Sequence, residues 1–281
     1  MNRVWLVTCS AMPDGEEWAG TNLLAPAIRS RGYDVAWVAW DDSSVDWGSG
    51  LVCLRSPWDY STRLAEFLAW TRTLPHVLNS ARIFEWNTDK SYLVQLSAAG
   101  VPVVPTEVVG DPAGLDSARQ RFDGVTVLKP AVGVGGQGLV VAEPGTESRW
   151  QWDGAVVVQP LLESVRTEGE WSVFVFGGQP VSAALKHPAS GEIRVHEEHG
   201  GRTEPAELTA ELAELALSAV AGAEQALGQT LDYARVDALR LANGSLAVSE
   251  LEATEPGLYL EVLPHNAEAF ADLVHARMNR Q

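Results

Sequence analysis

The chain has 281 residues, a length that suits one compact multi-lobed enzyme or two to three small domains. Its 20 basic and 37 acidic residues give a net charge of −17, which argues against nucleic acid or an anionic membrane surface as a partner. No apolar run is long enough to cross a membrane. The two cysteines, Cys9 and Cys53, are expected to be buried free thiols, which favours a reducing cytoplasm.

Strands alternate with helices in the first 85 residues. Apolar runs predict strands at 4–8, 34–40 and 51–54, and helical periodicity predicts helices at 18–31 and 62–73. This alternation is typical of a parallel sheet covered by helices. Residues 1–85 are therefore expected to form an N-terminal α/β lobe.

Residues 86–160 are expected to form a second, smaller α/β lobe. The sequence predicts helices at 88–99 and 111–121, and strands at 101–109, 125–129 and 139–142. The prolines of the first of these strands suit a sheet edge.

The pattern then changes to that of an antiparallel sheet with tight glycine turns. Strands are predicted at 155–160, within 170–188, at 192–201, and on both sides of the hairpin signal Asn243-Gly244, at 232–244 and 245–253. Helices are predicted at 207–227 and 265–279. Residues 161–281 are therefore expected to form a C-terminal α+β lobe.

A glycine-rich stretch links two of the predicted strands in the second lobe. It follows Lys129 and contains Gly133, Gly135, Gly136 and Gly138. Its spacing is not that of a P-loop, and a strand rather than a helix follows it, so it is not a dinucleotide-binding fingerprint. The stretch predicts a hairpin loop whose N–H groups fold over phosphates. The alternative is a plain flexible turn.

Three carboxylates fall on the two strands around Asn243-Gly244. They are Asp237, Glu250 and Glu252, and the last two share one face of their strand. Oxygen ligands of this kind suit Mg²⁺ bound to phosphates. The alternative is a solvated acidic face of the sheet.

Lysine is scarce in this sequence. Lys90, Lys129 and Lys186 are the only three, and arginine supplies the other 17 basic residues, among them Arg194 and Arg235. Each lysine is therefore a candidate point-charge ligand for phosphate, with an ordinary surface lysine as the alternative.

These features, in this order, resemble the ATP-grasp superfamily, and the resemblance covers residues 86–262. Within it the chain is most similar to the glutathione-synthetase-like ligases, in particular the subgroup that contains an O-ureido-serine cyclo-ligase. The stretches Leu-Arg-Ser-Pro-Trp-Asp-Tyr at 54–60 and Asn-Thr-Asp-Lys at 87–90 look like that subgroup. The resemblance implies three lobes: a parallel α/β lobe and two α+β lobes that clasp ATP.

The resemblance also implies roles for individual residues in binding ATP. Lys90 and Lys129 would reach the α- and β-phosphates, under the glycine loop. The backbone of Gln159, Pro160, Leu161 and Leu162 would bind adenine, and Glu170 would bind the ribose hydroxyls. Lys186 and Arg194 would meet the γ-phosphate or an acyl phosphate, and Arg235 would orient the acceptor or the phosphate. Asp237, Glu250 and Glu252 would hold two Mg²⁺ ions.

The chain departs from the family pattern at three places. Glu252 stands where asparagine is usual, and a carboxylate there adds one negative charge. Lys186 and Ser172 stand where glutathione synthetases have arginine, which argues against a glutathione-type substrate. His196 and His199 accompany Arg194, and we expect both to be surface residues because no metal-ligand spacing surrounds them.

A substrate site is expected at residues 55–60, after a strand of the first lobe. Ligands bind at this end of the strands in open α/β sheets. Arg55 would grip a carboxylate and Asp59 an ammonium group, with Trp58 and Tyr60 beside them. This arrangement suits an amino-acid substrate. The alternative is a Pro-Trp turn that joins two lobes.

The predicted activity is ATP-dependent formation of an amide or ring bond on a small amino-acid-like substrate, through an acyl phosphate. Two alternatives remain: an ATP-grasp ligase that acts on a ribosomal peptide, and a non-catalytic nucleotide-binding sensor. A sensor could lose Lys129 or the metal carboxylates, whereas this chain retains them. Self-association is a further expectation from the family.

Overall fold

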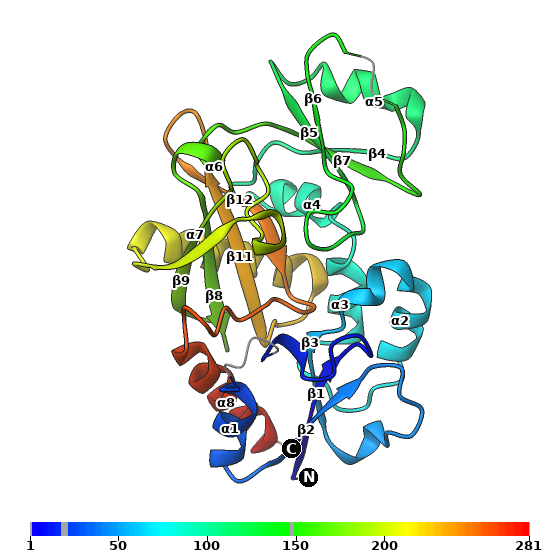
Figure 1. Cartoon of the computed structure of the whole chain (residues 1–281), viewed down its shortest axis with the longest axis vertical. Helices are drawn as coiled ribbons and strands as arrows, with labels where there is room; N and C mark the ends of the chain where they lie inside the picture. Colours follow the sequence, from blue (N-terminus) through cyan, green and yellow to red (C-terminus); the bar gives the residue numbers. More distant parts are fainter. Residues whose placement is uncertain (1, 18–21, 147–148, 281) are drawn as a thin grey trace.

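A computed structural model describes residues 2–17, 22–146 and 149–280 of the chain. Its strands form sheets of three, four and five strands. Figure 1 shows the three-stranded sheet at the lower end of the molecule, the four-stranded sheet at the upper end and the five-stranded sheet between them. No helix among the described residues is long and apolar enough to cross a membrane.

The three-stranded sheet is parallel, as predicted, with the order β2-β1-β3. Its strands are β1 (Arg3–Thr8), β2 (Asp34–Ala39) and β3 (Leu51–Ser56), and the helices near it are α1 (Leu24–Ser30), α2 (Leu64–Thr71) and α3 (Ala81–Asn87). Residues 18–21 of the helix predicted at 18–31 lie outside the described residues. The sequence analysis did not predict α3.

Alternate residues of β3 pack on opposite faces of this sheet. Leu51 and Cys53 join the core that contains α1 and the C-terminal helix, whereas Val52 and Leu54 join the core that contains α2 and α3. A strand covered on both faces reads as a continuous apolar run, which explains why it was recognised from sequence. Cys9 and Cys53 are buried free thiols, as expected.

The four-stranded sheet is antiparallel, with the order β4-β7-β5-β6. It contains β4 (Glu107–Val109), β5 (Thr126–Pro130), β6 (Val140–Ala142) and β7 (Val156–Pro160), with α5 (Pro112–Arg119) against it and α4 (Tyr92–Ala98) before it in the chain.

The predicted strand 101–109 is only β4 at its end, because Pro102 and Pro105 have no N–H for a sheet ladder. The residues before β4 instead follow the edge of β12. The Val104 N–H donates to the Val248 carbonyl at 2.9 Å, and the Val248 N–H donates to the Pro102 carbonyl at 2.8 Å.

The five-stranded sheet is antiparallel, as predicted, with the order β10-β9-β8-β11-β12. Its strands are β8 (Glu170–Phe176), β9 (Gln179–His187), β10 (Arg202–Ala206), β11 (Tyr233–Arg240) and β12 (Leu246–Glu252). The remaining helices are α6 (Ser164–Thr167), α7 (Ala210–Leu227) and α8 (His265–Met278). The hairpin around Asn243-Gly244 therefore joins β11 to β12, as its sequence indicates.

The prediction of a strand at 192–201 is wrong. The strand in this region is β10, which begins directly after residue 201. The Glu192 carboxylate accepts hydrogen bonds from the N–H groups of Ile193 and Arg194, at 2.8 and 3.1 Å. The end of the segment forms a single 3-10 turn, Glu197–His199. Local hydrogen bonds thus replace those of a sheet partner.

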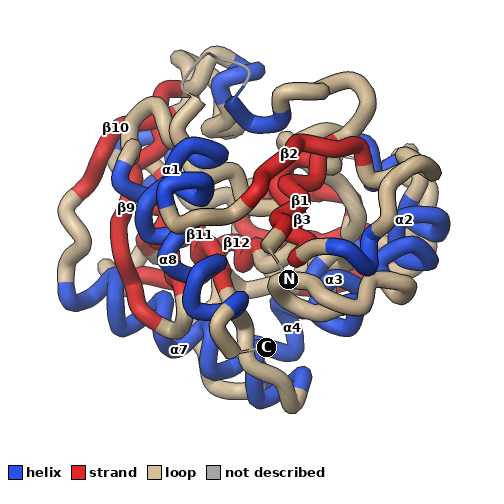
Figure 2. Tube along the Cα trace, turned by 90° about the horizontal axis from the view of Figure 1, so that it is seen from below, coloured by secondary structure: helices blue, strands red, loops and turns tan. Residues whose placement is uncertain are grey.

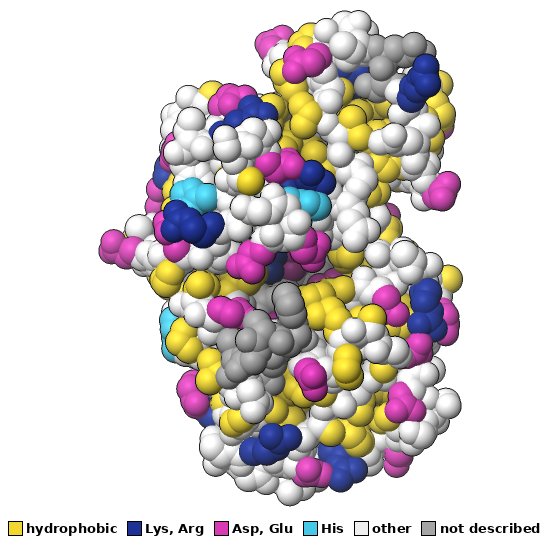
Figure 3. Space-filling model, in the orientation of Figure 1, with side chains coloured by type: hydrophobic (Ala, Val, Ile, Leu, Met, Phe, Trp, Pro, Cys, Tyr) yellow, Lys and Arg dark blue, Asp and Glu magenta, His cyan; other side chains and the backbone are white. Residues whose placement is uncertain are grey.

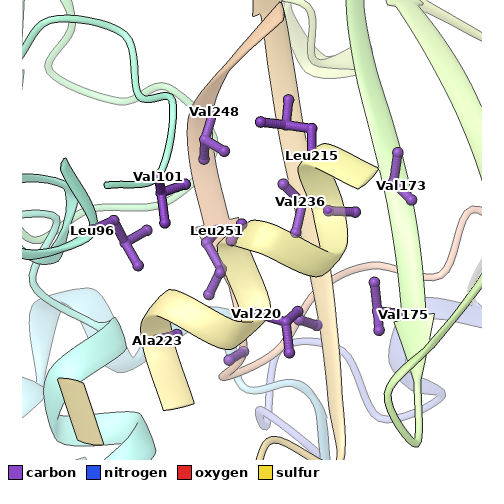
Figure 4. Packing of buried hydrophobic residues seen from close by; sticks show 14 of the residues in the cluster. Leu96, Val101, Val173, Val175, Leu215, Val220, Ala223, Val236, Val248 and Leu251 are labelled. Atoms are coloured by element: carbon purple, nitrogen blue, oxygen red, sulfur yellow. The ribbon is translucent and has the colours of Figure 1, made fainter. Parts of the chain in front are cut away.

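Helix α7 covers one face of the five-stranded sheet. Figure 4 shows Leu215 and Val220 of α7 packed against Val173, Val175 and Val236 of the sheet. The helix begins after Thr209, whose hydroxyl accepts from the Leu212 N–H, and ends at Gly228 in the left-handed conformation, with φ of 64°.

Helix α8 lies beside α1, next to the sheet that begins the chain (Figures 1 and 2). Arg31, which follows α1, forms ion pairs with Glu268 and Asp272 of α8 at 3.0 and 2.6 Å. The last helix therefore packs against the first lobe in the sequence rather than only against the five-stranded sheet.

Candidate active site

A cavity of about 920 Å³ is lined by segments from the whole length of the chain. Its walls come from the regions 11–16, 58–60, 133–139, 159–162, 193–198 and 249–261. Figure 3 shows acidic, basic and histidine side chains gathered in the middle of the face, below the part that carries the four-stranded sheet. A volume of this size accommodates a nucleotide together with a small second substrate.

Lys90 lies between the glycine loop and β12. Its Nζ donates to the Gly133 carbonyl at 2.7 Å and pairs with Glu250 at 3.1 Å. Burial lowers the pKa of Lys90, but Glu250 outweighs that effect and raises it overall. The lysine therefore stays charged and holds the start of the loop against the cavity.

The glycine loop connects β5 to β6 as a hairpin, as predicted. Gly135, Gly136 and Gly138 have φ of 60°, 67° and 72°, a region that side chains disfavour. Gly133, Gly135 and Gly136 line the cavity, whereas Gly138 is exposed and does not. The backbone can therefore approach a ligand closely along most of the loop.

Lys129, at the end of β5, lines the cavity without an ion-pair partner among the described residues. Burial lowers its pKa and neighbouring Lys90 adds to this effect, and together they outweigh the opposing effect of Glu250. A partly buried ammonium group without a partner favours binding of an anion.

Asp237 forms the centre of a buried charged cluster on β11. Its carboxylate accepts hydrogen bonds from Ser172 at 2.7 Å, from Lys186 at 2.9 Å and from Arg235 at 2.9 and 3.0 Å. Burial raises the pKa of Asp237, but Arg235 and Lys186 outweigh it and hold the pKa below its usual value. Asp237 is therefore ionised and fixes both cations at the cavity wall.

Of the three predicted metal carboxylates, Glu250 and Glu252 line the cavity, whereas Asp237 is buried and does not. Arg235 pairs with Glu252 at 2.5 Å, which matches their opposite positions on β11 and β12. Burial, together with Asp237, Glu255 and Glu250, raises the pKa of Glu252 to about 8 even though Arg235 opposes this.

The three predicted metal ligands do not form one cluster. Among the described residues, no group of three or more His, Cys, Asp or Glu side chains is arranged to hold a metal ion. Mg²⁺ bound to nucleotides, however, usually takes only one or two protein carboxylates, with phosphates and water completing its shell. Glu250 and Glu252 fit that requirement, since both line the cavity beside the lysines, and a bound cation would oppose the effect that raises the pKa of Glu252.

The strand β7 ends at the segment predicted to bind adenine. Gln159, Pro160, Leu161 and Leu162 all line the cavity. The Leu161 N–H already donates to the Val125 carbonyl at 2.9 Å. The Leu162 N–H has no hydrogen-bond partner among the described residues, so it is the donor free to meet a ligand.

Glu170, predicted to bind ribose, lines the cavity at the start of β8. Its carboxylate accepts from the Ser249 hydroxyl at 2.5 Å and pairs with Lys186 at 3.1 Å. Lys186 thus lies between Glu170 and Asp237, and although burial lowers its pKa, these two carboxylates raise it overall.

The segment around Arg194 faces the glycine loop across the cavity. His199 Nε2 lies 3.1 Å from the Gly135 carbonyl, and Arg194 pairs with Glu192 at 2.5 Å. His196 lines the cavity, its Nδ1 is buried without a hydrogen-bond partner among the described residues, and burial lowers its pKa. The prediction that His196 lies on the surface is therefore wrong.

Only two of the four predicted substrate residues reach the cavity, Trp58 and Tyr60. Arg55 is fully buried, pairs with Glu16 at 2.7 Å and donates to the Pro256 carbonyl at 2.5 Å. Asp59 accepts from the Trp40 indole at 2.8 Å. The structure therefore places neither Arg55 nor Asp59 where it contacts a ligand in the cavity.

Three cavity residues were not assigned to a site from the sequence: His196, Glu255 and Tyr259. Glu255 is 7% exposed and lies three residues after Glu252, beyond the end of β12. A carboxylate inside the run 253–260, whose other residues are uncharged, was the available signal, because a charged residue is seldom buried without a partner.

The lysines and arginines of the cavity, the glycine loop, the segment 159–162 and the two glutamates of β12 are together typical of one class of protein. The family comparison agrees with that class. The RimK-like ATP-grasp domain family matches residues 89–262, and the family described as the N-terminal domain of D-cycloserine synthetase DcsG matches residues 4–79. The chain belongs to the RimK-like ATP-grasp family and is an ATP-dependent, ADP-forming ligase.

Comparison with individual proteins shows which members of the family the chain resembles. The cycloserine biosynthesis protein DcsG of Streptomyces lavendulae is 31% identical over 276 residues, which cover 91% of this chain and 92% of the relative. The crystal structure of D-cycloserine synthetase DcsG matches with a TM-score of 0.84 at 27% identity, covering 98% of this chain and 99% of that one. A glutathione synthetase from a Synechocystis species is 30% identical over 158 residues, 53% of this chain and 47% of the relative. The subgroup recognised from sequence is confirmed.

Proposed function

We propose that this ligase forms a ring or an amide bond on a small amino-acid-like substrate, as the similarity to D-cycloserine synthetase suggests. One observation carries the proposal. A single cavity is lined by Lys90, Lys129 and Lys186 together with Glu250 and Glu252, and it extends to aromatic residues beside the three-stranded sheet. The cations suit a triphosphate, and the remaining space suits a small molecule.

The nucleotide end would lie against β5 and β7. The free Leu162 N–H and the neighbouring backbone of the segment 159–162 would bind adenine, and Glu170 would reach the ribose hydroxyls. Lys129 and Lys90 would bind the α- and β-phosphates, with the N–H groups of the glycine loop above them. This assignment gives an anionic partner to Lys129, which has no ion-pair partner among the described residues.

The reacting phosphoryl group would lie nearer β9 and β11. Lys186, Arg194 and Arg235 line this part of the cavity, and Asp237 fixes two of them. Fixed cations stabilise charge as it develops on the transferred phosphoryl oxygens, without reorganisation during the reaction. His196, with its free Nδ1, lies in the same region.

Glu250 and Glu252 would hold Mg²⁺. When bound, the ion neutralises charge on the β- and γ-phosphates and helps to orient them. Asp237 would join its ligands only by exchanging contacts with Lys186 or Arg235 that the structure shows. The carboxylate at position 252 adds negative charge that a divalent cation would offset.

The chemistry follows from these positions. A substrate carboxylate oxygen attacks the γ-phosphorus, the bond to the bridging oxygen breaks, and ADP leaves with that electron pair. A neutral nitrogen of the substrate then attacks the carbonyl carbon of the acyl phosphate, loses a proton and expels phosphate. The glycine loop and the 192–201 segment would exclude water that would otherwise hydrolyse the intermediate.

We also propose that the chain divides functionally at residues 85 and 160. The first part supplies the substrate end, the second the glycine loop, and the third the carboxylates and the γ-phosphate cations. Helix α8 would then tie the third part to the first through its contacts with α1.

ADP release from Mg-ATP, measured across amino acids, dipeptides and both configurations of O-ureido-serine, tests the proposal. We expect one small molecule to trigger ADP release, and mass spectrometry of the product then separates ring closure from the joining of two molecules. ATP binding without ADP release for any member of the panel would contradict the proposal. A ribosomal peptide ligase or a nucleotide sensor would then explain the chain better.

A further inference from the structure

The segment that follows β12, residues 253–258, is held by side chains from distant parts of the chain. Asn79 donates to the Ala253 carbonyl at 2.7 Å, and Asn87 accepts from the Ala253 and Thr254 N–H groups at 2.6 and 3.0 Å. Further along, Arg55 donates to the Pro256 carbonyl at 2.5 Å, and Glu16 accepts from the Leu258 N–H at 2.8 Å. These side chains fix the backbone on both sides of Glu255.

The Glu255 side chain itself is not part of this structural network. It is 7% exposed and lines the cavity. Tyr60 also lines the cavity beside it, and Glu255 forms no ion pair with any residue that the structure describes. The nearby cations are engaged elsewhere, since Lys90 pairs with Glu250 at 3.1 Å and Arg235 with Glu252 at 2.5 Å.

A buried carboxylate without a cation is unfavourable for stability. Side chains of four distant residues nevertheless hold the backbone on both sides of Glu255, so its place is not a consequence of loose packing. The missing partner is a cation with hydrogen-bond donors, and the cavity is the direction from which one can arrive. An ammonium group has the required charge and donors.

The walls around Glu255 select for a small cation. Trp58, Tyr60 and Tyr259 line the same cavity, and aromatic rings attract cations over their faces. Arg235 already lies over the Tyr259 ring, with its Cζ 5.0 Å from the centroid. Among the described residues no three carboxylates are arranged to hold a metal ion, so the aromatic walls favour an organic ammonium group at Glu255 over a free metal ion.

We propose that Glu255, with Tyr60 beside it, binds the amino group of the substrate. This inference rests on the proposed function and deepens it, because it requires a substrate acid that carries a free amine. Arg55 and Glu16 act as positioning residues through the backbone of 256–258. The ammonium-binding role that the sequence suggested for Asp59 then belongs to Glu255.

Steady-state kinetics of the full-length Glu255→Gln variant test this inference. Gln keeps the shape of the side chain and removes its charge, so we expect the fold and the KM for ATP to stay as in the wild type. The KM for O-ureido-serine should rise at least about 10-fold, and activity with the N-acetylated analogue should be absent in both proteins. Glu261→Gln is the matched control, because it removes the same charge from an exposed position on the cavity wall.

The outcomes distinguish a role of Glu255 in binding the substrate from a role in the chemical step or in the fold. An unchanged KM in Glu255→Gln, or a loss of kcat alone, would overturn the inference. A Tyr60→Phe variant should show a smaller rise in KM, because it removes only the neighbouring hydroxyl.

The inference remains testable if O-ureido-serine triggers no ADP release, which would count against the proposed function instead. NMR saturation transfer would then compare serine with glycerate, its counterpart without an amine, in the presence of Mg-ATP. Stronger transfer to serine in the wild type that disappears in Glu255→Gln would support the amine site. Equal signals in the two proteins would overturn it.

Discussion

Asp237 determines where two of the cavity's cations lie, although it does not line the cavity itself. Lys186 and Arg235 both donate to its carboxylate, and Ser172 completes the set of donors. These residues lie on β8, β9 and β11, so the neighbouring strands of one sheet set their distances. The electrostatics of the γ-phosphate region therefore depend on one buried side chain.

Asp237→Asn should lower kcat by on the order of 10²-fold or more, because the fixed cations that stabilise the transition state lose their common anchor. It should also lower the free energy of unfolding by about 3 kcal/mol at pH 7, since two buried cations lose a partner. The Asp237 pKa is depressed, so the wild type has this stability above the unfolded pKa near 4 and loses it as pH falls. Initial rates and urea unfolding measure both effects, and near-normal turnover would contradict the assignment.

The contribution of Glu252 to stability changes with pH in the opposite direction to that of Asp237. Its pKa is raised to about 8, so the folded state binds a proton that the unfolded state releases near pH 4.5. The contribution is favourable at low pH and is lost as pH rises from about 4.5 through 8. Glu252→Gln should remove this pH dependence. The free energy of unfolding of the variant, relative to that of the wild type, should therefore rise by roughly 1–3 kcal/mol from pH 5.5 to pH 8.5. Urea unfolding at those two pH values tests this prediction. The same difference in free energy of unfolding between variant and wild type at both pH values would contradict it.

Residue types with strong chemical preferences were predictable from sequence. The scarcity of lysine and the glutamate spacing on β12 identified cavity residues, because a strand places alternate residues on one face. The direction of Arg55 was not predictable, since β3 is buried on both faces and its pattern carries no alternation. Glu255 was missed because it lies beyond the strand, where spacing no longer defines a face.

Among the elements, the segment 192–201 covers the cavity without regular structure. His199 contacts the glycine loop, and Arg194 and His196 line the cavity. Gly201 closes the segment, and a Cβ at this position would lie 2.1 Å from the Val195 carbonyl oxygen. Only glycine therefore allows the chain to fold back so tightly.

Gly201→Ala should displace this segment and raise the KM for ATP by about 10-fold, because misplaced groups lose their contacts with phosphate. The melting temperature should change little, since the segment contributes few residues to the core. Gly191→Ala at the other end is the control: its φ of 81° disfavours a side chain, but its Cβ would meet nothing within 4 Å. Equal KM values for the two variants would show that the turn does not position the cavity wall.

Elements with periodic patterns were predicted well, and those stabilised by local contacts were not. Helix α7 has a capping threonine, a terminal glycine and a clear apolar face. The apolar alternation at 192–201 suggested a strand, but the Glu192 side chain supplies the hydrogen bonds. Such side-chain caps are not visible in a hydrophobic pattern.

At the scale of the whole molecule, the sequence predicted one parallel and one antiparallel sheet, but not how they surround a cavity. The cavity is lined by residues from position 11 to position 261. Its geometry depends on long-range contacts such as Asn79 with Ala253 and Arg31 with Asp272. Pairs this far apart leave no periodic signal in a single sequence.

Transfer of oxygen from substrate to phosphate tests whether ATP activates the substrate's carboxyl group. The substrate found by ADP release would carry ¹⁸O in both carboxylate oxygens, and ³¹P NMR would follow the released phosphate. An acyl phosphate intermediate predicts one ¹⁸O in each phosphate, because the attacking oxygen stays on phosphorus when the amine displaces it. Unlabelled phosphate, formed together with ADP and product, would contradict carboxyl activation and would require water or another group to attack ATP.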